Sequence, residues 1–378
     1  MPPKKKTAAA PPTSLGGLRE RMTKKYGDGR VVRRSEVEPY QVISTGSYEL
    51  DRATIVGGLV RGRIHEIAGQ EGSGKTTLTI NIMREAQKAY PDLAAGYIDM
   101  EQAFDWDWAE ANGLDTSDKK FFYAYPDNSE DVSDQIKEMM ETGLFSVVVV
   151  DSIGGMESKV AFDKEAEERV MGNNAQVITR MCKRLAMLAR KHKVAVVLIN
   201  QFRANLANPM GQDITAGPKA LKYSTTMRID VRQVFEDRIM ATLAGIKDPQ
   251  EIGVKISARV VRNKVGPKGR KGDFFLISQA TEEHGPIGID TATEALTIGI
   301  ESGLIQVEGG GYHSFPWTTD KKDRVRGRDT VLSFLRENPK RSAEIRALAI
   351  TAQASEVIAE VDNSFDPVTG EVFDEVSA

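Results

Sequence analysis

The chain has 378 residues, of which 40% are hydrophobic and 28% charged, and its formal net charge at pH 7 is −3. Its apolar runs are too short to cross a bilayer, its first residues lack the apolar stretch of a signal peptide, and its single cysteine, Cys182, cannot form an internal disulfide. These features argue against membrane, secreted and disulfide-stabilised classes, so we expect a cytoplasmic protein with one large core and a packed Cys182 thiol.

Charge is concentrated at the two ends of the chain. Residues 1–34 carry ten Lys or Arg against two acids, whereas residues 356–378 carry seven acids and no base. We expect residues 1–12 to be a disordered, basic and proline-rich arm, and residues 351–378 to be an acidic tail.

Three regions are expected between these ends. An N-terminal piece over 13–50 begins with a short helix at 14–27 and continues as an extended segment at 38–51. A large core follows over 51–280. From about residue 281 the sequence changes to short helical patterns with a glycine-rich break, which predicts a small α+β domain over 281–350.

The expected core has an α/β pattern. Runs that are apolar throughout alternate with helical patterns, which indicates a mostly parallel central sheet covered on both faces. Ligands of such sheets bind at the carboxyl ends of the strands. The predicted parallel strands are 62–69, 94–101, 145–152 and 194–201, the helices are 75–90, 128–143 and 173–192, and three antiparallel strands follow at 226–235, 254–265 and 273–280.

The turn after the first run fits the phosphate-binding spacing G-x-x-x-x-G-K-[ST]. Its glycines let backbone N–H groups approach phosphate oxygens, and the next helix adds its positive end. Lys75 supplies charge to the outer phosphates, and the Thr76 hydroxyl is placed to bind magnesium. A glycine-rich turn that binds nothing is the alternative, but the preceding strand and following helix favour nucleotide. The predicted cradle is Gly69, Gln70, Glu71, Gly72, Ser73, Gly74, Lys75, Thr76 and Thr77.

Polar residues end the other strands. Asp151 is placed to hold a magnesium-bound water, Glu101 to activate a water that attacks the γ-phosphate, and Gln201 to sense that phosphate. Taken alone, Asp151 could cap a turn, Glu101 could be a surface acid, and Gln201 could satisfy backbone groups.

Two long segments, 154–175 and 202–220, follow the last two of these strands. Each joins apolar residues to basic flanks, a combination suited to inserting between bases while contacting phosphates. Mobile surface loops are the alternative, and without further observations we favour them slightly.

An ordered set of motifs carries a more specific resemblance. The stretches "ISTGSYELD", "EIAGQEGSGKTTLT", "IDMEQAFD", "VVVVDSIGGM", "INQFR", "VVRNKVGP" and "FLRENP" resemble those of the bacterial RecA-type recombinases, over nearly the whole chain. The resemblance implies a P-loop RecA-like core with ATP and Mg²⁺, a subunit-docking N-terminal arm and a duplex-gathering C-terminal domain. It also implies a helical filament on single-stranded DNA that exchanges strands with homologous double-stranded DNA in recombination, repair and the SOS response.

The resemblance also implies roles for single residues. Lys75, Glu101 and Gln201 are similar to the family's catalytic residues, with Gln201 coupling ATP to DNA. Asp105 and Trp108 would frame the adenine, while Arg262 and Lys264 look like the two cations that reach the ATP of the adjacent subunit. Its implied DNA-binding residues are Arg169, Met171, Gly172, Asn173, Thr179, Arg180, Lys183, Arg203, Leu206, Gly217, Lys222, Arg326 and Arg328.

Some features depart from the family. In the first long segment the sequence "FDKEAEERVMG" differs from the usual bacterial sequence, and Gln176 stands where the family often has an arginine. The second long segment is short for the family. A single-strand-binding protein or loader is a possible partner under the same resemblance. Two alternatives keep ATP binding: a ring-forming helicase or packaging motor, and a DNA-coating scaffold or mediator without productive hydrolysis.

Overall fold

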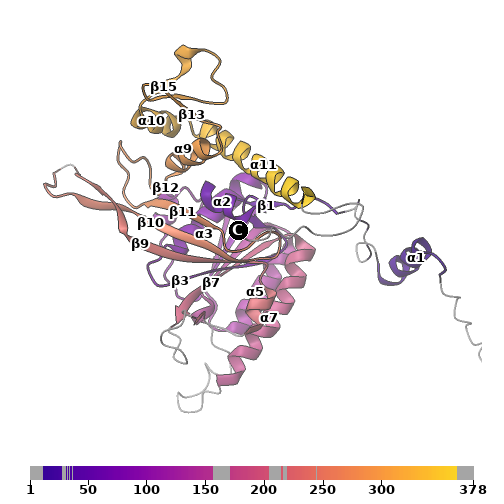
Figure 1. The fold of residues 1–378 in the computed structure, drawn as a ribbon. Helices are drawn as coiled ribbons and strands as arrows, with labels where there is room; N and C mark the ends of the chain where they lie inside the picture. The colour runs from indigo at the N-terminus through magenta and orange to yellow at the C-terminus, as the bar shows by residue number, and fades with distance from the viewer. Residues whose placement is uncertain are drawn as a thin grey trace, which may run out of the picture. The chain divides into compact units, whose positions relative to one another are not determined.

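The computed structural model describes residues 12–27, 31, 33, 35, 37–155, 171–203, 214–215, 219–243 and 245–363 (Figure 1). The chain divides into two compact units, residues 1–41 and residues 42–378. Within the described ranges, no helix combines the length and the apolar character that a membrane span requires.

The first unit contains helix α1 (Leu15–Tyr26), which confirms the helix predicted at 14–27. Ser14 caps its N-terminus by accepting a hydrogen bond from the Gly17 backbone N–H at 3.1 Å. Helix α1 has no buried residue. Its large apolar side chains are all exposed; these are Leu15, Leu18, Met22 and Tyr26.

The second unit is built on a ten-stranded sheet in the order β12-β11-β10-β9-β3-β7-β6-β4-β5, with β8 (Ile214–Thr215) paired to β7. Strands β3, β7, β6, β4 and β5 run parallel to one another. The fold class and the four predicted parallel strands are confirmed. A fifth parallel strand, β5, was missed. The bounds are β3 Ile64–Gly69, β4 Ala94–Asp99, β5 Phe121–Ala124, β6 Phe145–Asp151 and β7 Ala195–Arg203.

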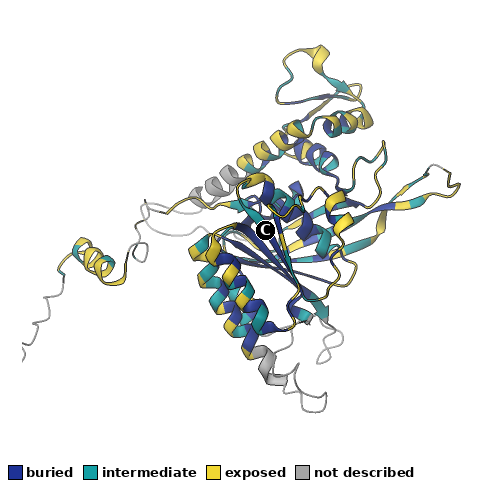
Figure 2. Ribbon diagram, turned by 180° about the vertical axis from the view of Figure 1, so that it is seen from behind, coloured by how far each residue is buried: buried dark blue, intermediate teal, exposed yellow. Residues whose placement is uncertain are grey.

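Helices cover both faces of the parallel strands, which are buried along most of their length (Figure 2). Alternate residues of one strand enter different cores, as the two-residue period of a strand requires. Val147 and Val149 join the cluster that contains α3, whereas Val148 and Val150 join the cluster that contains α5 and α7. These helices, all predicted, are α3 (Lys75–Ala89), α5 (Ser129–Thr142) and α7 (Met171–His192).

Cys182 lies on α7 inside the second cluster and is fully buried. Burial raises the pKa of its thiol to about 12. The predicted packed thiol is therefore confirmed.

The sheet is extended by strands β9 to β12, which pair with one another antiparallel, while β9 pairs parallel with β3. The three predicted antiparallel strands are confirmed, but their ends differ. Because β9 and β10 continue to pair beyond β11, they form a long hairpin that projects from the sheet (Figure 1). The bounds are β9 Met227–Ala241, β10 Gln250–Asn263, β11 Lys271–Ile277 and β12 Gly288–Ile289.

The extended segment predicted at 38–51 is wrong at its end. Strand β1 (Val42–Ile43) pairs with β2 (Leu59–Val60), but helix α2 (Tyr48–Thr54) begins before the segment ends. Ser47 caps this helix by accepting from the Leu50 backbone N–H at 3.1 Å.

The C-terminal part packs around a third apolar cluster that includes Leu296, Phe315 and Leu335. It contains a three-stranded antiparallel sheet. Helix α11 continues into the predicted acidic tail. The elements are α9 Thr291–Glu301, β13 Gln306–Glu308, β14 Tyr312–Ser314, β15 Val325–Arg326, α10 Arg328–Glu337 and α11 Pro339–Asn363.

Helix α2 ties this C-terminal part to the sheet through two buried carboxylates. Glu294 from α9 accepts the Tyr48 and Glu49 backbone N–H groups at 2.9 and 3.2 Å. Arg346 from α11 forms an ion pair with the fully buried Asp51, which also accepts the Thr45 N–H at 2.8 Å. The contacts made by Glu294 and Arg346 join residues that are more than 240 positions apart.

Candidate functional site

The candidate site lies at the carboxyl ends of the parallel strands, where it was predicted. The register of the sheet places Gly69 beside Gln201 and Asp99 beside Asp151. The last residues of β3, β4 and β6 and a residue near the end of β7 therefore share one edge of the sheet.

The turn after β3 requires its glycines. Gly72 and Gly74 have φ angles of 71° and 85°, in the left-handed region that side chains disfavour. A Cβ built on Gly69 would lie 2.4 Å from both the Ser73 Oγ and the Val231 carbonyl oxygen. Helix α3 then begins at Lys75, so its free N–H groups point into the turn.

The polar groups of this turn suit an anionic ligand. Lys75 Nζ donates to the Gln70 carbonyl oxygen at 2.6 Å. Burial lowers the pKa of Lys75, against the opposing charges of Asp151 and Glu101. Ser73 Oγ is buried and has no hydrogen-bond partner among the described residues. A phosphate in the turn would supply the missing acceptor and the compensating charge.

Asp151 lies beside the start of α3. Its Oδ2 accepts from Thr76 Oγ1 at 3.3 Å and from the Tyr97 hydroxyl at 2.6 Å. Burial, with repulsion from Glu101 and Asp99, raises the pKa of Asp151 to about 6 although the Tyr97 hydrogen bond opposes the rise. A hydroxyl next to a carboxylate, at the phosphate turn, is the oxygen-only set that Mg²⁺ prefers, so these residues fit that ion.

The structure brings Glu101 and Gln201 together. Glu101 Oε1 accepts from Gln201 Nε2 at 2.9 Å and from Ser152 Oγ at 2.5 Å. The carboxylate of Asp99 accepts four successive backbone N–H groups, from Glu101 to Phe104, and so fixes the turn that presents Glu101.

Three residues of this network were missed from the sequence: Asp99, Tyr97 and Ser152. Asp99 and Tyr97 lie in the same predicted strand, two positions apart, and a period of two places them on one face. Ser152 immediately follows Asp151. A search for polar side chains along that one face of the strand would have found the first two.

Trp108 lies on helix α4 (Trp106–Ala111), next to the phosphate turn, and Asp105 immediately precedes this helix. Asp105 caps this helix by accepting from the Trp108 backbone N–H at 2.9 Å. Trp108 Nε1 donates to Thr77 Oγ1 at 3.0 Å, and its ring packs against the core. A residue of the predicted cradle therefore anchors the predicted base-binding aromatic.

Arg262 and Lys264 lie far from the phosphate turn of their own chain. Arg262 is paired with Arg228 at the start of β9, and the adjacent Met227 is paired with His65. Arg228 itself is paired with Glu66, which precedes Gly69 by three residues, so Arg262 lies about 10 Å from the turn along the strand direction, and its strand is two places from β3 in the sheet. Lys264 lies farther from the turn, because its backbone bonds to Thr226, which bonds to Ile64 at the start of β3. They gather instead around Tyr223, to whose carbonyl oxygen Lys264 Nζ donates at 2.6 Å. Burial and the nearby Arg262 lower the pKa of Lys264.

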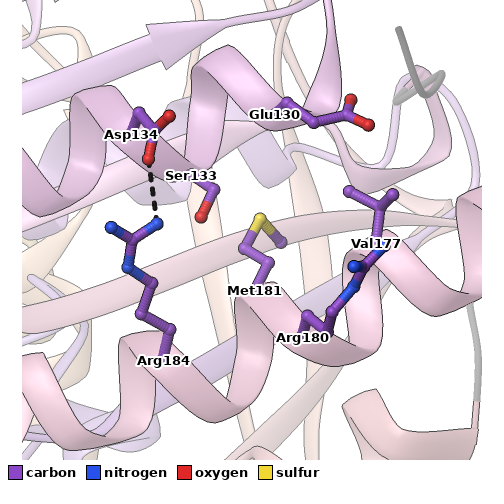
Figure 3. A pocket seen from close by; sticks show the side chains of 7 residues that line it. All are labelled: Glu130, Ser133, Asp134, Val177, Arg180, Met181 and Arg184. Atoms are coloured by element: carbon purple, nitrogen blue, oxygen red, sulfur yellow. Dashed lines mark hydrogen bonds and ion pairs between the residues drawn. The ribbon is translucent and has the colours of Figure 1, made fainter. Parts of the chain in front are cut away.

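A pocket of about 300 Å³ lies between α5 and α7 (Figure 3). Arg184 points across it to Asp134, with an ion pair of 2.8 Å. Arg180, one turn earlier on α7, is exposed and has no ion-pair partner among the described residues. The pocket therefore presents one neutralised and one available guanidinium.

The predicted DNA-binding residues fall into groups. Thr179, Arg180 and Lys183 lie on α7, and Lys222 lies exposed on α8 (Lys219–Ser224). Arg326 and Arg328 are exposed at β15 and the start of α10. Arg169, Leu206 and Gly217 lie outside the described residues, and only the backbone is described for Met171, Gly172, Asn173 and Arg203.

Comparison with known proteins points to one family. The family model described as RecA N-terminal domain matches residues 16–280. The chain is 32% identical to Protein RecA of Thermotoga neapolitana over 86% of this chain and 89% of the relative. It is 31% identical to Protein RecA of Roseiflexus castenholzii over 93% and 96%, and 31% identical to that of Syntrophus aciditrophicus over 84% and 86%.

The raised pKa of Asp151 predicts a pH-dependent stability difference for Asp151→Asn. Between about pH 4 and pH 6 the unfolded chain has released this proton while the folded chain retains it, so this carboxyl reduces stability as pH rises through that window. The amide lacks this effect. Relative to the native chain, the variant should gain about 2–3 kcal/mol of unfolding free energy from pH 4 to pH 6.

Denaturant unfolding at several pH values measures this difference. Asp99→Asn is the comparison variant. It replaces one carboxylate oxygen with an NH₂ group that would face backbone N–H donors, so this variant should be destabilised at pH 7. A constant difference between Asp151→Asn and the native chain across the window would contradict the prediction.

Proposed function

The chain belongs to the RecA family of recombinases, and on that premise we propose that it hydrolyses ATP with Mg²⁺ while it is assembled on single-stranded DNA. The filament then pairs that strand with homologous duplex DNA and exchanges strands. The observation that carries the proposal is the 2.9 Å hydrogen bond between Gln201 and Glu101 beside an intact phosphate turn. This bond joins Glu101, which is suited to activate the attacking water, to the end of β7, which leads into the predicted DNA-contacting segment 202–220.

ATP would be held by the turn from Gly69 to Gly74 and the start of α3. Lys75 would leave the Gln70 carbonyl oxygen for the β- and γ-phosphates, which compensate its buried charge better. Thr76 and Asp151 would hold Mg²⁺, which neutralises phosphate charge when bound. Trp108, fixed by Thr77, offers an aromatic surface to the base.

Hydrolysis would use Glu101. As a water oxygen bonds to the γ-phosphorus and the bond to the leaving ADP oxygen breaks, the Glu101 carboxylate accepts the water proton. A γ-phosphate also competes for the Gln201 amide that now donates to Glu101. Binding of ATP would therefore move Gln201 and free the carboxylate, while loss of phosphate would restore the present contact.

Self-assembly would complete the site. The separation of Arg262 and Lys264 from their own phosphate turn supports a role for these cations at the ATP of a neighbouring copy. Cations donated across a subunit boundary would stabilise charge on the phosphates and make assembly depend on ATP. The uncovered apolar side chains of α1 also support self-association.

DNA binding would draw on two basic surfaces. One lies on α7 and α8, with Arg180, Lys183 and Lys222 exposed. The other lies in the C-terminal part, where Arg326 stacks 5.6 Å from the Tyr312 ring centroid and would gather duplex DNA. The acidic tail would compete with DNA for this second surface. We further propose a cytoplasmic location, with a single-strand-binding protein or loader as partner.

Glu101→Gln tests the catalytic role. The amide keeps the size of the side chain but cannot accept the water proton, so DNA-stimulated ATP turnover should fall at least a hundredfold. Filament formation on single-stranded DNA with ATP should persist. The measurement is phosphate release with and without DNA, beside electron microscopy of the same samples.

Glu110→Gln, an exposed acid on α4, makes the same chemical change in a control position and should keep native turnover. Native turnover in Glu101→Gln would refute the catalytic assignment, whereas rings in place of helical filaments would refute the recombinase mechanism.

Arg180→Ala tests the surface on α7. If Arg180 contacts a phosphate, its loss should weaken binding to all single-stranded sequences alike and reduce the salt dependence, −dlogK/dlog[salt], by about 0.7. Fluorescence anisotropy of a labelled oligonucleotide over a salt series measures this slope. Arg190→Ala removes the same charge from the last turn of α7 and should leave the slope unchanged. Equal slopes for both variants would contradict a phosphate contact at Arg180.

A further inference from the structure

The hydroxyl of the buried Tyr97 donates a hydrogen bond to Asp151, the candidate magnesium ligand. Tyr97 on β4 is 1% exposed, and its hydroxyl donates to Asp151 Oδ2 at 2.6 Å. The ring lies 4.6 Å from Phe104 and 6.4 Å from Tyr123, centroid to centroid. Its packing and its hydrogen bond are therefore separable: the ring fills the core, and the single oxygen reaches the site.

The sheet register explains how this residue reaches the site. Asp99 is paired with Asp151, and Tyr97 precedes Asp99 by two residues. The two side chains on β4 thus share one face of the sheet, and the phenol is long enough to span the remaining distance along it. The same ring belongs to the cluster that contains Leu78 of α3, so it connects the core to the edge of the site.

The two carboxylate oxygens of Asp151 differ in the hydrogen bonds that they accept. Oδ2 receives both hydrogen bonds that the described residues donate to this carboxylate, from Thr76 and Tyr97. Oδ1 receives none of them. Two donors from different elements fix the rotation of the carboxylate, since either donor alone would let it turn.

We propose that Tyr97 is a positioning residue for the magnesium site: its hydroxyl holds Asp151 Oδ2 so that Oδ1 is kept for the ion and its waters. This inference rests on the Mg²⁺–ATP site of the proposed function. Helix α3 supplies one of the two holding donors through Thr76, and the rigid core supplies the other. A carboxylate held in this way loses little freedom when the ion binds.

A second tyrosine shows what a purely structural hydroxyl looks like in the same aromatic cluster. The Tyr123 hydroxyl donates to Asp99 Oδ2 at 3.0 Å. The Asp99 carboxylate is already committed to four backbone N–H groups of the 101–104 turn. Removal of this hydroxyl leaves a well-satisfied carboxylate, so Tyr123→Phe is the matched control for Tyr97→Phe.

The test titrates Mg²⁺ against binding of a fluorescent ATP analogue to the full chain. Tyr97→Phe keeps the ring and should raise the half-saturating Mg²⁺ concentration about tenfold, the usual effect of losing a group that orients a metal ligand. Binding of the analogue without Mg²⁺ should stay the same. Tyr123→Phe should keep the native Mg²⁺ requirement, and both variants should unfold cooperatively on heating.

Three outcomes overturn the proposal. The first is a native Mg²⁺ requirement in Tyr97→Phe, and the second is an equal shift in both variants, which would assign the effect to the aromatic cluster. The third is loss of cooperative unfolding in Tyr97→Phe, which would make the hydroxyl a folding element. A native chain whose binding of the analogue does not depend on Mg²⁺ would refute the proposed magnesium site, and one that binds no analogue at all would refute the nucleotide site; both results are distinct from these three.

Discussion

The parallel register of β3, β7, β6 and β4 is the constraint on which the rest of the site depends. It places the phosphate turn, Asp151, Glu101 and Gln201 at one edge of a sheet whose strands are otherwise buried. A slip of one residue would turn every side chain of a strand to the opposite face. The two apolar clusters that hold α3 on one face and α5 and α7 on the other specify that register.

Polar and charged groups are costly at such an edge, and the structure compensates them with hydrogen bonds within and between strands. Gln201 is an example: its backbone N–H donates to Asn200 Oδ1 at 2.9 Å, and Asn200 donates to the buried Glu66 of β3 at 2.8 Å. The backbone at Gln201 is therefore held while its side chain contacts Glu101. Under the proposed function, the amide could change its partner while the backbone of the strand stays in place.

The sequence predicted those parts of the molecule that carry a local signal. The four central strands are continuous apolar runs, and the phosphate turn has a fixed spacing, so both could be found without the structure. Helix α2 was missed because part of its N-terminal cap, Glu294, comes from 247 residues away from Ser47. Strand β5 is short, and only its first residue is buried. Tyr97 looked like one more apolar residue in a buried strand, because the hydrogen-bond partner of its hydroxyl lies on a different strand, β6.

The separation of Arg262 and Lys264 from their own phosphate turn leads to the central claim, that ATP is enclosed between two copies of the chain. A mixing experiment measures this most directly, with Lys75→Ala in one chain and Arg262→Ala with Lys264→Ala in the other. Each chain alone should be inactive as a DNA-dependent ATPase. In an equal mixture about one quarter of the head-to-tail boundaries join an intact turn to intact cations, so activity should recover toward about a quarter of the native rate. A mixture that stays as inactive as its components would contradict the shared site.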